Sequence, residues 1–238
     1  MGRTGIYACG ECVSRRSSFE LVVLYSLKQE APASIGGSTF TVIMYYSPKI
    51  LSLAGFSSTE DQMIGTVING IVFVLSTFIA IGMVDKGGRK PALKIGFGVM
   101  AASMAVVGVC MGLLEAGNAP VFVPYLAAIM TMVSIAGFGM SAGPIVWVLC
   151  SEIQPLKSRE FGIACSTMTN WITCAIVGAT FLTLVDTLGS SMTFWLYAAL
   201  NGFFIVLTIS FVPETKNVSL EKIEQNLMKG KKLREIGC

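Results

Sequence analysis

Long apolar stretches alternate with short polar or charged segments along most of this chain. Five of the stretches reach the roughly 20 residues that a helix needs to cross the hydrocarbon core of a bilayer. They occupy about residues 63–84, 92–114, 121–150, 160–185 and 192–212. A sixth stretch, 33–54, is less regular because prolines, adjacent glycines and a lysine interrupt it or flank it: Pro32, Pro48, Gly36, Gly37 and Lys49. The pattern predicts an all-α membrane protein, a bundle of six transmembrane helices.

Composition supports a membrane protein and argues against an enzyme. The chain has 238 residues, of which 53% are hydrophobic and only 13% charged, whereas soluble domains carry about 25% charged residues. Histidine is absent, so no imidazole can relay protons or bind a metal. Cys9 and Cys12 form a lone C-x-x-C, which is a weak signal for a metal or redox site. We therefore expect no metal, no cofactor, no nucleic-acid partner and no catalytic nucleophile–base pair.

The charges of the loops predict how the chain lies in the membrane. Basic residues gather in alternate loops and after the last span: Lys86, Arg89, Lys90, Lys94, Lys157, Arg159, Lys216, Lys222, Lys229, Lys231, Lys232 and Arg234. The opposite turns are acidic at Glu60-Asp61, Glu115 and Asp186. Because basic loops stay on the cytoplasmic side, both termini are predicted to be cytoplasmic, with residues 213–238 forming a cytoplasmic helix.

The apolar stretch 121–150 is not a plain membrane anchor. Gly137, Gly139, Gly143 and Pro144 interrupt it. Broken backbone at membrane depth survives where protein or a water-filled cavity covers it, and discontinuous helices are typical of transporters. A kinked helix that only packs against its neighbours would give the same pattern.

A few polar and aromatic residues in the spans are candidates for binding a small polyol. Asn170-Trp171 lies inside an otherwise apolar span, and Trp147 follows the Gly-Pro break by one helical turn. An indole offers a flat apolar face to a sugar ring and an N–H to a hydroxyl. Tyr45 and Tyr46 add hydroxyl groups on the irregular first span. The alternative for these aromatic residues is the belt at the membrane interface.

Three loop motifs resemble those of a known family. The loop Asp85–Lys90 (DKGGRK) resembles the D-R-x-G-R-R/K motif of the major facilitator superfamily. Glu152–Arg159 (EIQPLKSR) resembles the E-x-x-P-x-x-x-R loop of its sugar porters, and Pro213–Lys216 (PETK) resembles the signature that closes their last span. The resemblance runs from about Val42 to Cys238 and covers the C-terminal half of a twelve-helix transporter. In detail it is similar to bacterial galactose– or arabinose–proton symporters.

The resemblance implies a sugar site between two six-helix bundles. By position, the residues that would contact a monosaccharide, a hexose or a pentose, are Tyr45, Tyr46, Gly143, Trp147, Asn170 and Trp171. A cytoplasmic charge network that holds one state of the transporter would comprise Asp85, Arg89, Glu152, Arg159 and Glu214. The alternative for these charges is ordinary solvated loops, in which each ion pair contributes little.

Several positions depart from the family pattern. Ile35 and Gly36 stand where the family has two glutamines, and Thr41, Phe73 and Cys174 stand where it has asparagines. These amides hydrogen-bond sugar hydroxyls in the family, so most of the hydrogen-bonding surface is lost while the aromatic surface remains. Asn69, one turn before Phe73, is a misplaced candidate substitute.

The resemblance also predicts what the chain needs from elsewhere. The first bundle carries the proton-coupling carboxylate in family symporters, and the acidic residues of this chain fall at or near loops and termini. We expect a truncated sugar–proton symporter of the bacterial inner membrane, inactive without an N-terminal half. The alternative is a non-functional remnant of a disrupted transporter gene. A homodimer of two such chains would still lack the carboxylate.

The expected organisation has three parts. Residues 1–32 form a segment that does not match the family, residues 33–212 the six-helix bundle, and residues 213–238 the tail helix. Because the resemblance begins at about Val42, residues 1–41 are hypothesised to reflect a shifted reading frame or a truncated gene, or to be disordered.

Overall fold

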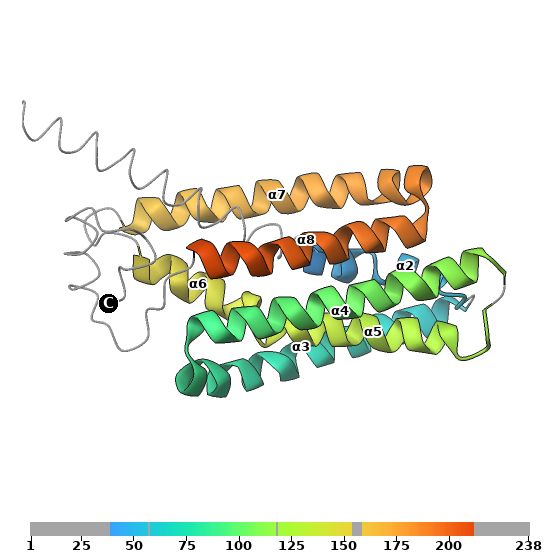
Figure 1. Ribbon diagram of the computed structural model, residues 1–238, viewed down its shortest axis with the longest axis horizontal. Helices are drawn as coiled ribbons and strands as arrows, with labels where there is room; N and C mark the ends of the chain where they lie inside the picture. Colours follow the sequence, from blue (N-terminus) through green and yellow to red (C-terminus); the bar gives the residue numbers. More distant parts are fainter. Residues whose placement is uncertain (1–38, 57, 118, 154–158, 212–238) are drawn as a thin grey trace, which may run out of the picture.

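The computed structural model describes residues 39–211 except residues 57, 118 and 154–158, and it describes side chains there except those of 83–87, 149–153, 210 and 211 (Figure 1). These residues form helices and turns, with no strand among them. A helical segment, 39–45, comes first. The helices that follow are α2 (Ser47–Leu53), α3 (Thr59–Gly87), α4 (Arg89–Glu115), α5 (Val123–Gly139), α6 (Ala142–Ile153), α7 (Arg159–Leu188) and α8 (Ser190–Phe211).

Within the described residues, five helical stretches are long and apolar enough to cross a membrane, which confirms the five long predicted spans. They are Thr59–Gly82, Arg89–Glu115, Val123–Val148, Arg159–Leu188 and Ser190–Ile209. The sixth predicted span, 33–54, is described only from Thr39 onward. There it is helical to Tyr45, turns at Tyr46 and continues as α2, which has Pro48 in its first turn. The tail helix predicted at 213–238 and the segment 1–32 lie outside the described residues.

Helix α4 lies at the centre of the bundle. It packs most extensively against α8 and against α5, while α3 packs on α5, and α7 packs on α8 and α6. All the long helices run along the long axis of the molecule (Figure 1). In the most apolar part of α4 44% of the residues are buried, compared with 17% in α3 and in α7. Helices α3 and α7 therefore present most of their surface to the surroundings of the bundle.

Small residues allow the central helices to approach closely. A Cβ on Gly96 of α4 would collide with the side chain of Ser141 and lie 2.9 Å from the carbonyl oxygen of Gly137. On the other side of α4, Gly108 and Gly112 form a G-x-x-x-G pair whose absent side chains leave room for Trp195 and Ser191 of α8. Such pairs favour helix association in membranes, where packing rather than water exclusion drives assembly.

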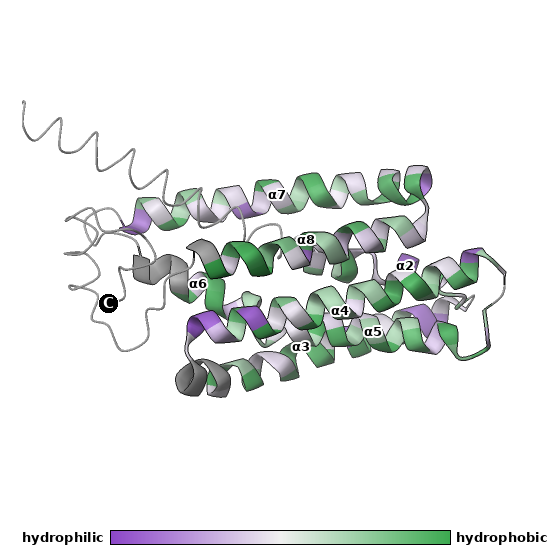
Figure 2. Cartoon of the chain, viewed as in Figure 1, coloured by the Kyte–Doolittle hydropathy of each residue, from purple (hydrophilic) through white to green (hydrophobic). Residues whose placement is uncertain are grey.

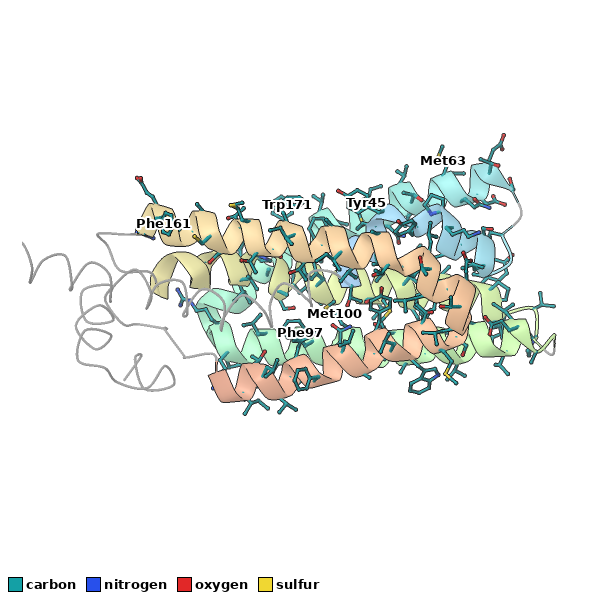
Figure 3. All side chains as sticks on the ribbon, turned by 90° about the horizontal axis from the view of Figure 1, so that it is seen from above. Tyr45, Met63, Phe97, Met100, Phe161 and Trp171 are labelled. Atoms are coloured by element: carbon teal, nitrogen blue, oxygen red, sulfur yellow. The ribbon has the colours of Figure 1, made fainter. Side chains whose placement is uncertain are left out.

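Two clusters of buried side chains fill the interior. The larger lies between the segment 39–45 and helices α2, α4, α5, α7 and α8 and contains Met104, Phe181 and Phe194. The smaller contains Phe97, Met100 and Phe204 near the other end of α4. Figure 3 shows Phe97 and Met100 between the ribbons. Both clusters contain residues of α4, so this helix runs through the centre of the core.

Polar groups tie α4 to α8 at both ends of the bundle, where Figure 2 shows the hydrophilic residues. At one end, Oε1 of Glu115 accepts hydrogen bonds from the backbone N–H groups of Ser190 (2.7 Å) and Ser191 (3.4 Å). A carboxylate satisfies the first N–H groups of a helix and interacts favourably with its dipole. At the other end, Nζ of Lys90 donates to the carbonyl of Ile209 at 3.0 Å. Both contacts stabilise the same pair of helices.

Candidate functional site

A cavity of about 400 Å³ opens between the helical segment 39–45 and helices α3, α5, α6 and α7. Four of the six residues predicted to bind sugar line it: Gly143, Trp147, Asn170 and Trp171. The remaining lining residues are Phe40, Thr41, Phe73, Thr77, Phe138, Ala142, Pro144, Val146 and Cys174. The structure thus brings Trp147 and Trp171, which lie on different helices, to one cavity.

The predicted interruption of the stretch 121–150 is present and forms part of the cavity wall. Helix α5 ends at Gly139, a turn follows at Met140 and Ser141, and α6 begins at Ala142. Ser141 Oγ donates to the carbonyl of Gly137 at 2.6 Å, which satisfies a backbone group at the break. Pro144 lies in the first turn of α6, where a missing N–H costs no helical hydrogen bond. The break directs the first turns of α6 toward the cavity.

Helix α7 supplies the opposite wall through two consecutive residues. Asn170 is half-buried, and Trp171 is 59% exposed. Trp147 on α6 is 43% exposed. Both indoles line the cavity and yet leave much of their surface uncovered, so the cavity is open along the side where these tryptophans lie.

Tyr45 and Tyr46 line a second cavity of about 470 Å³, which shares Thr41, Trp171 and Cys174 with the first. The two tyrosines differ in their surroundings. Tyr46 donates its hydroxyl to the carbonyl of Gly178 at 2.9 Å, and its ring lies 4.9 Å from that of Phe181. Tyr45 is 70% exposed and lies on the same side of the bundle as Trp171 (Figure 3). Tyr46 thus holds α7 in place, whereas Tyr45 presents its hydroxyl at the open side.

The positions that depart from the family pattern lie in or near the cavity. Thr41 and Cys174 both stand where the family pattern has an asparagine, and Thr41 Oγ1 donates to Cys174 Sγ at 3.5 Å. Phe73 occupies the wall of α3. Asn69 lines neither cavity, because its Nδ2 donates to Ser47 Oγ at 2.8 Å inside the α2–α3 contact. Asn69 is thus misplaced relative to both cavities, as its position one turn before Phe73 predicted.

Sequence reasoning did not anticipate the aromatic cluster at this cavity. The rings of Phe40 and Phe138 stack with centroids 4.2 Å apart and planes 9° apart, and Phe73 lies 4.7 Å from Phe40. Phe138 stands between two glycines, Gly137 and Gly139. The two flanking glycines could have indicated this position, because glycines on both sides of a large ring let neighbouring helices come close to it.

The predicted charge network falls mostly outside the described side chains. The side chains of Asp85 and Glu152 are not described, and Glu214 lies outside the described residues. Arg89 begins α4 and Arg159 begins α7, at the same end of the bundle (Figure 1). Both are half-buried. The network stays a prediction.

Solved structures with the same arrangement define the class of protein. An inward-open structure of the xylose transporter XylE from Escherichia coli matches 95% of this chain and 47% of its own length, with a TM-score of 0.67 and 28% identity. A double-tryptophan mutant of XylE matches 86% of this chain and 42% of its own, with a TM-score of 0.72 and 29% identity. The arrangement of the membrane-length helices is therefore that of the major facilitator fold, of which the chain covers less than half.

The chain belongs to the sugar (and other) transporter family, whose model matches residues 35–227. It is 63% identical over 197 residues to the galactose–proton symporter of E. coli, covering 83% of this chain and 42% of that protein. It is 53% identical over 223 residues to the arabinose–proton symporter of E. coli, covering 94% of this chain and 46% of that protein. The chain thus spans less than half the length of these curated relatives, which are transporters and not enzymes.

The extent of the similarity toward the N-terminus differs between the comparisons. The alignment with the galactose–proton symporter covers 197 residues, which is the length of the predicted resemblance from Val42 to Cys238. The family model begins at residue 35, and the alignment with the arabinose–proton symporter covers 223 of the 238 residues, so it includes part of the segment before Val42. The hypothesis of a shifted reading frame stays a prediction.

Proposed function

We propose that this chain forms the C-terminal six-helix half of a monosaccharide–proton symporter of the bacterial inner membrane. The observation that carries the proposal is the cavity in which Trp147, Asn170 and Trp171 meet, in a chain 63% identical to a galactose–proton symporter. Two indole faces can cover the C–H surface of a pyranose ring. The Asn170 amide can donate to one hydroxyl and accept from another.

Proton coupling needs a group that the described part of the chain does not place at the cavity. Among the described side chains, the carboxylates lie in the first or last turns of helices: Glu60, Asp61, Glu115, Glu160 and Asp186. A proton carrier of a symporter lies at membrane depth, beside the transported molecule. We therefore propose that a second six-helix bundle, on the same polypeptide or a separate one, supplies this carboxylate.

The open side of the cavity is where the second bundle would act. Trp171, Trp147 and Tyr45 are all more than 40% exposed there. Rocking of one bundle against the other about a central site gives alternating access. The predicted charge network at the ends of α4 and α7 would bias one state of this motion, because a few charge pairs can shift a two-state equilibrium.

Co-expression tests the proposal directly. Residues 1–238 are expressed in transport-deficient E. coli alone and together with the N-terminal six-helix bundle of the galactose–proton symporter. We expect uptake of labelled galactose or arabinose, with alkalinisation of the medium, only when both are present. Proton-linked uptake by the chain alone would contradict the need for a second bundle.

Two neighbouring residues of α7 provide a matched pair of variants for this assay. Trp171 lines the cavity, whereas Ile172 is similarly exposed but does not line it. Trp171→Ala should lower uptake about tenfold, since losing an aromatic stacking surface costs about 1.4 kcal/mol. Ile172→Ala should leave uptake unchanged. Membrane insertion without uptake in every combination would instead favour a non-functional remnant.

A further inference from the structure

The floor of the cavity is aromatic rather than polar. Phe40, Phe73 and Phe138 come from three separate segments, and their ring centroids lie 4.2, 4.7 and 6.3 Å apart. Phe40 stacks face to face on Phe138, and the planes of Phe73 and Phe138 differ by 24°, so the three rings form one compact apolar cluster. All three line the same cavity as Asn170 and Trp171.

The threonine hydroxyl groups near this floor already donate hydrogen bonds within the protein, so they can only accept hydrogen bonds from a ligand. Thr77 Oγ1 donates to the carbonyl of Phe73 at 2.9 Å, and Thr41 Oγ1 donates to Cys174 Sγ. Each sugar hydroxyl that is buried against phenylalanine without a hydrogen-bond partner weakens binding. A free monosaccharide carries hydroxyls around its whole ring. It can therefore form hydrogen bonds on the Asn170 side of the cavity, whereas its hydroxyls lack such partners on the phenylalanine side.

We propose that this cavity prefers a monosaccharide with an aromatic substituent, an aryl glycoside, over the free sugar. The aromatic ring would lie against the three phenylalanines, where offset or edge contacts between rings are favourable beyond the burial of apolar surface. The sugar would lie toward Asn170, Trp147 and Trp171. The cavity of about 400 Å³ is of the size that accommodates ligands larger than one sugar ring. This preference rests on the proposed sugar site.

Calorimetric titration of the purified full chain in lipid nanodiscs tests the preference. The ligands are phenyl β-galactoside, methyl β-galactoside and benzyl alcohol. We expect phenyl β-galactoside to bind at least tenfold more tightly than either of the others. Equal binding of the two glycosides, or binding of none of them, would overturn the proposal. Benzyl alcohol binding as tightly as the phenyl glycoside would overturn it as well.

Variants locate the effect on the phenylalanine floor. Phe73→Leu keeps the position apolar and should reduce the phenyl-over-methyl preference at least threefold. Phe203→Leu is the matched control, because Phe203 on α8 is exposed and does not line the cavity. Phe73→Asn should raise the affinity for methyl β-galactoside. An undiminished phenyl preference in Phe73→Leu would overturn the proposal.

The titration tests the aromatic subsite and the uptake assay tests the sugar transporter, so the result of one can contradict its proposal without contradicting the other. Uptake of free galactose by the co-expressed halves, with no phenyl preference in the titration, would reject the aromatic subsite and retain the sugar transporter. A phenyl preference that Phe73→Leu weakens would support the subsite, even where uptake fails.

Discussion

At the scale of the residue, two glycines of α4 differ in the space around them. Gly96 faces the break between α5 and α6, where a Cβ would meet Ser141 and the carbonyl of Gly137. Gly98, half a turn further on, has nothing within 4 Å of an added Cβ. Space at the helix crossing, and not the conformational freedom of glycine, distinguishes the two positions.

The two glycines give a matched pair of stability variants. Gly96→Ala should lower the free energy of unfolding by about 1–3 kcal/mol, because overpacking forces side chains and backbone apart. Gly98→Ala should leave it unchanged or raise it by less than about 1 kcal/mol, since alanine is the better helix former. Denaturant titration in detergent, followed by circular dichroism, measures both. Equal effects of the two substitutions would show that the α4–α5 crossing tolerates a methyl group.

Residue patterns anticipated only part of the candidate site. Trp147, Asn170 and Trp171 stood out because polar or amphipathic groups are unusual inside apolar stretches. Phe40, Phe73 and Phe138 did not, because phenylalanine is ordinary in a membrane span. Their meeting depends on how three separate segments pack. Likewise, only the tertiary structure shows that the Tyr46 hydroxyl is committed to Gly178.

At the scale of the element, the hydropathy pattern predicted the five long spans and the interrupted one. The break lies at Met140 and Ser141, and the glycines and the proline that predicted it flank this turn on both sides. The glycines permit a close approach of neighbouring helices, and the proline is tolerated in the first turn of the next helix. Sequence periodicity could not predict which helix is central, since all five spans are similarly apolar.

The start of α8 depends on a carboxylate from another helix. Glu115→Ala removes the acceptor for the N–H groups of Ser190 and Ser191 and should destabilise the bundle by about 1 kcal/mol. Asp186→Ala is the control, because Asp186 lies near the end of α7, where a negative charge opposes the helix dipole. Thermal unfolding in nanodiscs would compare them. A larger loss of thermal stability in Asp186→Ala than in Glu115→Ala would contradict the capping role of Glu115.

At the scale of the whole molecule, charge separates the two ends of the bundle. Lys90, Lys94 and Arg159 lie at one end together with the single described carboxylate Glu160, and Glu60, Glu115 and Asp186 lie at the other. We propose that the basic end faces the cytoplasm, in line with the positive-inside rule, which would place both termini there.

Alkaline phosphatase fusions test this orientation, because the enzyme is active only outside the cytoplasm. Fusions after Gly117 or Gly189, in the turns at the acidic end, should be active. A fusion after Gly88, in the basic turn between α3 and α4, should be inactive and serves as the control. The reverse pattern would invert the proposed topology.

The contacts between α4 and α8 reach almost the whole length of the pair. Glu115 and Lys90 hold α8 near both of its ends, and Ser191 Oγ donates to the carbonyl of Gly108 on α4. Helix α7, which carries Asn170 and Trp171, is joined to α8 through the turn at Gly189, whose φ is +84°. Any tilt of α7 about this turn that widened the cavity would break the hydrogen bond from Tyr46 to Gly178.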